Sequence, residues 1–381
     1  MRLLSNLKYF SHNKLRLLLL VVPLFLSVAL LYTVHMIITS YFELQYNAFL
    51  ETRKAYTSIQ SRSSLITNDL LRALRLHENT EKIIPCILSY TEIDGVISTV
   101  GIRIYALNEA DLKDLARSME LTLSSGRLPR PGTREIVLHE TVLKNKGLAI
   151  GDTIGNEVDS EEKLTGFFEI VGTLKGKALA GFSSLETWTA QTGVEDPLKY
   201  GMLIYPKKGM LEALNRYINY LPLNGYDISS YSLNSSSMEK SYESIRIILT
   251  VIYTAVLMIV SLCLGFLTYL FYNGRLREFA ILYIMGYSRQ SLLLRSLLEI
   301  LVINSIAVIM GILFSVLTGR VLNLIYFAGR GTPLVLFSFE TLVLSLCAPM
   351  LCVIAQLVAV ILPLYRRDML DVIEQENGGL T

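Results

Sequence analysis

Residues 273–299 read NGRLREFAILYIMGYSRQSLLLRSLLE, and this stretch decides how the chain folds. It lies between two long apolar segments and carries four arginines against two acids. Its centre, residues 278–285, combines apolar side chains with flanking charge and ends at Gly286. A short amphipathic block between two apolar segments is typical of an elbow that joins two membrane helices outside the bilayer. We therefore interpret the flanking segments as membrane spans.

Four stretches of at least 20 residues lack Asp, Glu, Lys and Arg: residues 17–42, 247–274, 300–319 and 341–365. About 20 helical residues cross a hydrocarbon core of about 30 Å. The chain is 52% hydrophobic and its mean hydropathy is +0.45, as expected for a membrane protein. Buried helices of a soluble protein are the alternative, but such helices rarely run so long without charge. We predict four transmembrane helices at residues 17–42, 247–274, 299–319 and 341–365.

The charges beside these segments predict the topology. Residues 1–16 contain four bases and no acid, residues 275–298 contain four arginines, and Arg366 and Arg367 follow the last segment. Positive loops stay in the cytoplasm, so both termini and the elbow are expected there. The first apolar run is longer than the roughly 7–15 residues of a signal peptide, which favours an uncleaved membrane helix. Residues 43–246 and the short loop 320–340 are expected outside the cytoplasm.

Residues 43–246 are expected to form a mixed α/β domain carried by two stalk helices. The first stalk would extend helix one towards Ile59, and the second would occupy residues 236–247. Residues 1–16 are expected to form an amphipathic helix on the cytoplasmic surface, and residues 366–381 a cytoplasmic tail. Within the domain, alternation and breakers predict strands at 95–106, 136–138, 167–174, 200–205 and 226–231, and helices at 67–76, 112–121 and 210–221.

With these motifs in place, the chain resembles the FtsX-like permeases, the superfamily that includes the MacB-type membrane subunits of ABC transporters. The elbow carries the resemblance through its REFAIL and MGYS runs and its final acid; the family usually has a basic residue where this chain has Tyr283. The outer run from residue 126 to 174 resembles the β-rich "sabre" part of the MacB-type periplasmic domain, and the flanking pieces its "porter" part. The matching elbow positions are Glu278, Phe279, Ala280, Ile281, Leu282, Met285, Gly286, Ser288 and Glu299.

The resemblance implies a function without a solute channel. Two such subunits pair, and two cytoplasmic ATPase subunits bind below them at the elbow. ATP-driven motion then passes to the outer domain, which is called mechanotransmission. It also implies the bacterial cytoplasmic (inner) membrane and a possible extracytoplasmic adaptor or substrate protein. The residues expected to couple to the ATPase are Arg277, Glu278, Phe279, Ile281, Leu282, Met285 and Gly286.

The sequence contains no motif for the ATPase that would drive this motion. A phosphate-binding loop requires G-x-x-x-x-G-K-[ST], whereas Gly176-Lys177 is followed by Ala178. We therefore expect no enzyme activity and no bound cofactor in this chain, with ATP and Mg²⁺ held by a partner ATPase. The cysteines show no CxxC spacing, and neither a metal site nor a nucleophile motif such as G-x-S-x-G is present. Nucleic acid is not an expected partner.

Two further sets of residues have structural and functional interpretations. Arg295 and Glu299, four positions apart at the inner end of helix three, are consistent with a snorkelling pair or with force transmission. Small residues recur every fourth position in helix three, which favours close packing within the four-helix unit and leaves a dimer face as the second interpretation. These small residues are Ala307, Gly311, Ser315 and Gly319.

Two functions remain open at the level of sequence. The first is a MacB-type permease that exports or extracts an amphipathic substrate such as a peptide, lipoprotein or drug. The second is an FtsX-like regulator that transmits ATPase motion to an extracytoplasmic cell-wall hydrolase. An ion-coupled transporter is disfavoured, because such proteins keep ionisable side chains inside the membrane and the four apolar segments contain no Asp, Glu, Lys or Arg.

Overall fold

The computed structural model describes residues 14–62, 64–193, 195–221 and 225–366. The chain divides into two compact units, each described by itself. Unit 1 comprises Met1–Ile38, Ile245–Leu322 and Val335–Thr381, and unit 2 comprises Thr39–Ser244 and Asn323–Leu334. The predicted N-terminal helix, apart from its last residues, and the tail that follows Arg366 lie outside the described residues.

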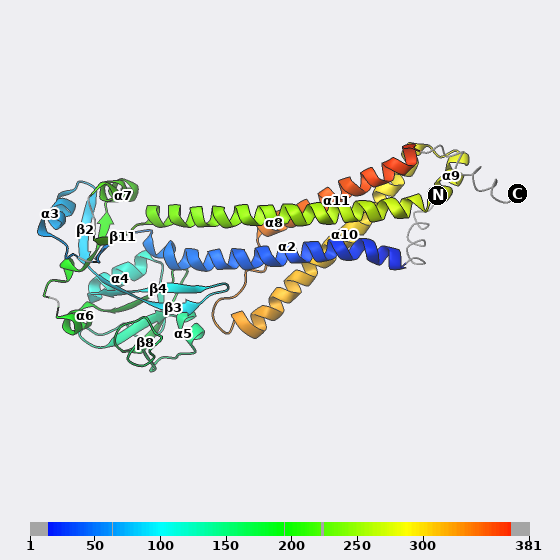
Figure 1. Cartoon of the computed structure of the whole chain (residues 1–381). Helices are drawn as coiled ribbons and strands as arrows, with labels where there is room; N and C mark the ends of the chain where they lie inside the picture. Colours follow the sequence, from blue (N-terminus) through cyan, green and yellow to red (C-terminus); the bar gives the residue numbers. More distant parts are fainter. Residues whose placement is uncertain (1–13, 63, 194, 222–224, 367–381) are drawn as a thin grey trace. The chain divides into compact units, whose positions relative to one another are not determined.

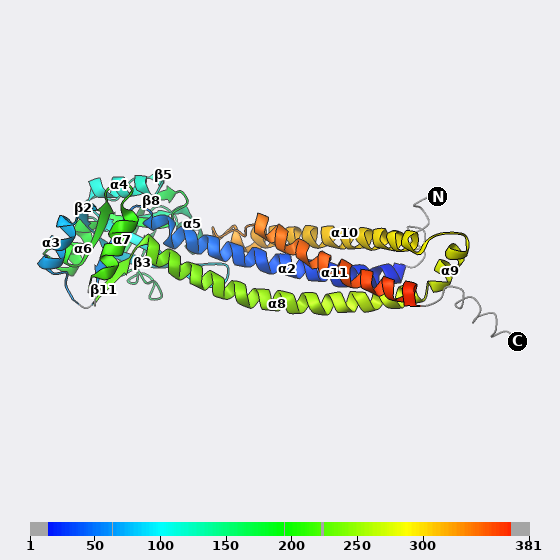
Figure 2. The same cartoon turned by 90° about the horizontal axis from the view of Figure 1, so that it is seen from above.

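Unit 1 is a bundle of long helices with a short helix, α9, at one end (Figures 1 and 2). Its core contains Leu24, Val28 and Leu264, all fully buried. A Cβ added at Gly311 would lie 2.9 Å from Val28 of α2, so the small residue permits close contact between the two helices. The helices are α2 (Lys14–Phe49), α8 (Tyr231–Asn273), α9 (Leu276–Ile284), α10 (Arg289–Leu322) and α11 (Phe339–Arg366).

Within the part of the chain that the structure describes, three helices are long and apolar enough to cross a membrane, by length and composition: Lys14–Arg53, Tyr231–Asn273 and Arg289–Phe327. In the described part of α11, the apolar helix is the shorter Pro349–Tyr365. The prediction of long apolar helices and an α/β domain is thus confirmed, and the described residues contain three candidate spans where four were expected. Within the expected elbow 275–298, α10 begins at Arg289 and runs without a break into the third apolar segment.

One sheet of unit 2 has four antiparallel strands in the order β11-β1-β10-β2. Helices α3 and α7 cover it with Leu74 and Ile218, which pack against Ile59 and Met202. The elements are β1 (Thr57–Ser61), α3 (Asn68–Leu76), β2 (Thr80–Pro85), β10 (Gly201–Pro206), α7 (Leu211–Tyr220) and β11 (Tyr226–Ser229), with short 3-10 turns at Glu51–Arg53 and Pro197–Lys199.

The second sheet of unit 2 is seven-stranded and mixed, in the order β3-β4-β9-β6-β8-β5, with β7 paired to β8. The pairs β4–β9 and β6–β8 are parallel and the others antiparallel. Fully buried Ile104, Ile136 and Phe168 form its core. The elements are β3 (Ile87–Asp94), β4 (Thr99–Leu107), α4 (Glu109–Ser118), β5 (Thr122–Gly126), β6 (Glu135–His139), α5 (Glu140–Lys146), β7 (Thr153–Ile154), β8 (Phe168–Lys175), β9 (Ala180–Ser184) and α6 (Leu185–Thr192).

The boundaries of unit 2 correct several predictions. Helix one does not continue to Ile59: α2 ends at Phe49, and Ile59 lies in β1. The strand expected at 226–231 ends at Ser229, because α8 begins at Tyr231 and already contains the second stalk. The helix expected at 112–121 occupies Glu109–Ser118, since Glu120 has a left-handed φ of 54° that no α-helix continues. The β2, β3, β5, β9, α5 and α6 elements were not predicted.

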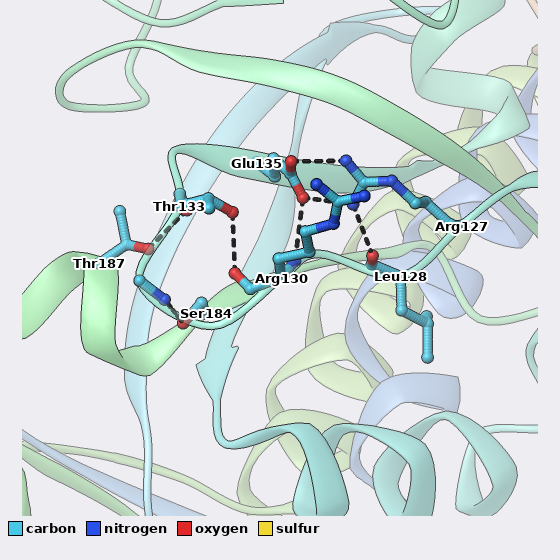
Figure 3. A network of polar contacts seen from close by, with 8 residues as sticks. Arg127, Leu128, Arg130, Thr133, Glu135, Ser184 and Thr187 are labelled. Carbon is cyan, nitrogen blue, oxygen red and sulfur yellow. Dashed lines mark hydrogen bonds and ion pairs between the residues drawn. The ribbon is translucent and has the colours of Figure 1, made fainter.

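A polar network fixes the loop that leads into β6 (Figure 3). The Arg127 guanidinium donates two hydrogen bonds to the Glu135 carboxylate, which also accepts from the Arg130 backbone N–H at 2.9 Å. Thr187 donates to the Thr133 carbonyl at 2.6 Å, and Gly132 N–H donates to Ser184. The hydrogen bonds to Arg127, first, and to the Arg130 backbone hold the pKa of Glu135 at about 2, below its ordinary value.

The loop between α10 and α11 belongs to unit 2. After a π-helical turn at Asn323–Phe327, it lies against α5 and the end of β3. The Asn145 side-chain amide donates to the carbonyls of Asp94 (2.8 Å) and Arg330 (3.0 Å), and its oxygen accepts from Asp94 N–H at 2.7 Å. A Cβ at Gly331 would lie 3.1 Å from the Thr141 backbone. The loop expected at 320–340 is therefore held by defined contacts within this unit.

Candidate functional site at residues 272–299

The elbow folds as a short helix, α9, with a turn of the backbone at each end. Arg275 precedes the first turn of α9, and the backbone closes after Ile284 with Gly286 N–H donating to the Tyr283 carbonyl at 2.9 Å. Gly286 adopts φ of 96°, where a side chain is strained, although its surroundings leave space for a Cβ. Tyr287 N–H then donates to the Leu282 carbonyl at 3.2 Å. This closure explains the need for glycine at the end of the amphipathic block.

A buried polar network joins the end of α8 to the start of α10. The Arg275 guanidinium donates to the Glu299 carboxylate at 3.0 Å, and the two side chains are only 9% and 5% exposed. The Tyr272 hydroxyl donates to the same carboxylate at 3.1 Å. Arg275 Nε donates to the exposed carboxylate of Glu278, also at 3.1 Å. Burial acts to lower the pKa of Arg275, but the Glu299 carboxylate raises it, so the net direction is upward and the guanidinium stays charged.

Aromatic rings complete this network. The rings of Tyr272 and Phe279 stack with an interplanar angle of 2° and centroids 5.8 Å apart. The Arg275 guanidinium lies 5.6 Å and 5.5 Å from their centroids. Phe279 is 3% exposed and packs with Leu276 and Leu292 in the bundle core. Phe279, one of the residues expected to couple to the ATPase, therefore lies on the bundle side of α9.

The opposite edge of α9 presents apolar side chains to the outside. Ile281, Ile284 and Met285 are 48%, 59% and 59% exposed. Leu282 is half-buried against the bundle core, so it sits between the two faces. Arg277 and Glu278 are exposed beside this edge. Of the expected coupling residues, the structure therefore brings Ile281 and Met285 together with Ile284, which the sequence interpretation had not selected.

Tyr283 occupies the position where related sequences were expected to carry a base. The guanidinium of Arg289, at the start of α10, lies 5.7 Å from the Tyr283 ring centroid and 5.9 Å from that of Tyr365 in α11. The aromatic face attracts the cation. Arg289 and the two tyrosines thus place a positive charge beside residue 283 and tie α9 to α10 and α11.

The remaining predicted residues lie along α10. Glu299 bonds Arg275 and Tyr272, and Arg295 is half-buried one turn before it. Ala307, Gly311, Ser315 and Gly319 are on a buried face or in close contact with a neighbouring helix, and the Ser315 hydroxyl donates to the Ala29 carbonyl at 2.9 Å. The sequence interpretation missed Tyr272 and Arg275 as site residues. Their signal was present, since Arg275 and Glu299 are opposite charges bordering adjacent apolar segments.

The site combines a buried ion pair with an exposed apolar edge. Its acids are engaged with Arg275, and among the described residues no group of three or more His, Cys, Asp and Glu side chains could hold a metal ion. Rigid attachment on one face and apolar exposure on the other are properties of a docking helix.

A comparison with protein families finds a match in the C-terminal part of the chain. Residues 250–367 match the family described as FtsX-like permease C-terminal. A comparison with curated proteins finds no match. The family assignment confirms the resemblance read from the elbow.

Solved structures similar to the chain include periplasmic and extracellular regions of permeases. The periplasmic region of MacB from Actinobacillus actinomycetemcomitans is 12% identical, with a TM-score of 0.31, 50% of this chain covered and 95% of that one. The extracellular domain of the noncanonic ABC-type transporter YknZ from Gram-positive bacteria is 10% identical, with a TM-score of 0.28 and coverage of 46% and 100%. A domain of a permease protein from Porphyromonas gingivalis is 11% identical, with a TM-score of 0.25 and coverage of 48% and 91%.

Proposed function

We propose that this protein is the membrane subunit of a MacB-type ABC transporter, which passes the motion of a separate ATPase to its extracytoplasmic domain. The FtsX-like permease domain at residues 250–367 supports an ABC-type permease subunit. ATP and Mg²⁺ would be bound by the partner ATPase. Both termini and α9 would lie in the cytoplasm, and α11 would be the fourth span of the bacterial inner membrane.

The observation that carries this proposal is the two-faced character of α9. Its inner face is held by Phe279 in the bundle core, whereas Ile281, Ile284 and Met285 are exposed at the other edge. An exposed apolar helix edge with flanking charge fits a groove on a partner protein. We assign this edge as the contact with the ATPase.

The elbow also offers a route for motion. Arg275 and Glu299 connect the end of α8 to the start of α10, so a displacement of α9 acts on both helices. The chain of α8 leads directly into unit 2 at Ser244, and the chain of α10 leads into the loop that Asn145 holds there. The chain thus connects the two units both through α8 and through the loop after α10, and Asn145 bonds that loop. Such connections suit transmission of force to the outer domain.

The exposed apolar surface of α8 is consistent with contact to a second permease subunit. Only 11% of its most apolar window is buried, against 39% for the helix starting at Lys14 and 44% for the one starting at Arg289. Lipid covers such a surface in the membrane, and a partner helix does so equally well. We propose that two permease subunits pair, as a homodimer or heterodimer, with α8 contributing to the contact.

We propose an amphipathic substrate, such as a peptide, lipoprotein or drug, that is exported or extracted from the membrane. In the outer domain, we assign the seven-stranded sheet, to which residues 126–174 contribute β6, β7 and β8, to the sabre-like part, and the four-stranded sheet to the porter-like part. Deletion of the gene would then sensitise cells to such compounds. A regulator of a cell-wall hydrolase would instead produce a wall-cleavage defect with unchanged efflux.

The test of the coupling site is co-purification with an ABC-type ATPase from the same organism that lacks membrane helices of its own. The double variant Ile284→Asp/Met285→Asp should weaken ATPase retention by about tenfold or more, since each buried apolar side chain contributes about 1.5–3 kcal/mol. Gln290→Asp, on the exposed start of α10, is the matched control and should retain the ATPase. Unchanged retention by the double variant would refute the assignment of this edge.

A further inference from the structure

Unit 1 contains a cavity of about 150 Å³ among α2, α8 and α11, lined by residues outside the elbow. His35 of α2 and Tyr253 of α8 line it, with Thr341 and Ser345 contributed by α11. His35 is 6% exposed, and Thr341 and Ser345 are 3% and 2% exposed. Side chains from three helices thus surround a space large enough for part of a small molecule.

Two polar side chains in this cavity have unused hydrogen-bonding capacity. Both ring nitrogens of His35 and the Tyr253 hydroxyl are buried without a hydrogen-bond partner in the described structure. A neutral imidazole carries one donor and one acceptor, and a phenol can act as either. Buried polar groups normally have partners, because leaving them unpaired destabilises the fold. Two such groups lining one cavity therefore point to a ligand that supplies an acceptor and a donor.

The other hydroxyls of the cavity define the ligand further. Thr250 and Thr254 donate to carbonyls of their own helix, each at 2.7 Å, and Ser345 donates to the Leu342 carbonyl at 2.8 Å. The protons of these three hydroxyls are engaged, and the Thr341 hydroxyl shares a hydrogen bond with the Ser338 hydroxyl. Among the described residues that line the cavity there is no Asp, Glu, Lys or Arg. The free donors therefore come from His35 and Tyr253, and they suit an uncharged carbonyl group with a neighbouring hydroxyl.

The position along the helices shows where such a group would come from. His35 lies late in the apolar stretch 17–42 of α2, and Tyr253 lies early in the stretch 247–274 of α8, so both are near the ends remote from the elbow. Leu31 and Leu257, which also line the cavity, are each one helical turn nearer to the elbow. The lining thus changes from polar to apolar along the bundle, as a bilayer changes from its ester region to its hydrocarbon.

The cavity also has an open side. Thr250 and Thr254 are exposed on the surface of α8, whereas Leu31 and Leu257 are buried. Because α8 is the least covered of the long apolar helices, this side faces its surroundings in the membrane. A molecule dissolved in the bilayer can reach His35 past these two threonines.

We propose that this cavity binds the glycerol-ester region of a membrane lipid, with an ester carbonyl accepting from Tyr253 or His35 and an acyl chain passing Leu31 and Leu257. Diacylglycerol and phosphatidylglycerol share this chemistry and differ in what lies beyond the glycerol. This site goes beyond the proposed transport function and does not depend on it, since its evidence comes from the bundle alone.

The test is photolabelling of the full chain in phosphatidylcholine nanodiscs. One arm contains a diacylglycerol with a diazirine on its acyl chain, and the other contains phosphatidylglycerol with the same chain. We expect labelled peptides to include Leu31 or Leu257 in at least one arm, and the arm that labels identifies the lipid. His35→Leu/Tyr253→Phe should reduce that labelling about tenfold, the effect of losing two hydrogen bonds.

A second variant leaves His35 and Tyr253 unchanged. Thr254→Trp should block the open side and reduce labelling, whereas Ile259→Trp, at an exposed position of α8 outside the cavity lining, should not. Labelling that is spread evenly over exposed α8 residues, or that is equal in wild type and in both cavity variants, would overturn the proposal. So would the absence of labelling in both arms, which would leave water as the partner of His35 and Tyr253.

Discussion

Arg275 and Glu299 stand 24 positions apart in the chain, yet the guanidinium donates to the carboxylate at 3.0 Å in nearly complete burial. Removing one member of such a pair leaves an unpaired buried charge, which costs about 3–5 kcal/mol. We predict that Glu299→Gln or Arg275→Met alone lowers the free energy of unfolding of unit 1 by this order. Thermal unfolding of the full chain in detergent measures the change.

The same pair allows a rescue experiment. Arg275→Met/Glu299→Leu removes both charges and should recover most of the stability lost by either single variant. Glu278→Gln is the control, because its side chain is 54% exposed and an exposed ion pair contributes only about 0–1 kcal/mol. If the double variant were as unstable as the single ones, the charges themselves would be essential to the elbow.

Asn145 is predicted to hold the 323–334 loop. Asn145→Ala removes its bonds to the exposed Asp94 and the half-buried Arg330, and each such hydrogen bond contributes about 0.5–1.5 kcal/mol. Hydrogen exchange should accelerate in the segments around Arg330 and Asp94. Asp94→Asn, which affects only an ion pair between side chains 44% and 60% exposed, should leave the exchange of the loop nearly unchanged. Equal exchange in both variants would contradict a fastening role for Asn145.

The sequence predicted features that depend on local composition. Long charge-free runs predicted apolar helices, and the short apolar run at residues 200–205 predicted β10, because both patterns reflect burial directly. β9, with the sequence AGFSS, is buried throughout and has neither alternation nor strong β propensity, so its strand conformation depends on pairing with β4 and β6.

The candidate site shows the same limit. The sequence of α9 predicts an amphipathic helix, but the residues of its apolar side divide between two environments. Phe279 meets Tyr272 and the core, whereas Met285 is exposed. Which residue faces the bundle depends on the angle between the axes of α8 and α9. That angle is set by tertiary contacts, among them the Arg275–Glu299 pair, that no local pattern encodes.

Glu135 is predicted to make unit 2 sensitive to acid. Its folded pKa of about 2 lies below the ordinary value of 4.5, chiefly because Arg127 donates to the carboxylate. The sign follows from linkage: the stabilisation is fully present above pH 4.5 and is lost as the pH falls towards 2. We predict that Glu135→Gln is less stable than wild type at pH 7 and that this difference shrinks below pH 4.5.

The measurement for Glu135 is the exchange rate of β6 peptides in wild type and variant at pH-corrected time points. Using the difference between the two proteins removes the contribution of other carboxylates that titrate in the same range. Glu161→Gln, at an exposed position, is the control and should show no such pH dependence. A wild-type-to-variant difference that stays constant from pH 7 to pH 3 would rule out the Arg127 pair as its source.

Arg53 is predicted to reduce the stability of unit 2. Its side chain is fully buried at the end of the Glu51–Arg53 turn, where Nη1 donates to the Phe49 carbonyl. Nε and Nη2 have no hydrogen-bond partner in the described structure. Replacing buried charges with apolar side chains of similar volume is often stabilising, by about 1–4 kcal/mol. Arg53→Met should therefore raise the unfolding temperature of the full chain.

The matched control for Arg53 is Arg62→Met, which changes an exposed arginine in the same unit and should shift the unfolding temperature little. The two variants make the same chemical change and differ mainly in burial. A stabilised Arg53→Met protein would show that the buried guanidinium is retained at a cost to the fold, which is expected of a residue kept for function. A destabilised one would mean that Arg53 has a partner of opposite charge in solution, since only a compensated cation stabilises a buried site.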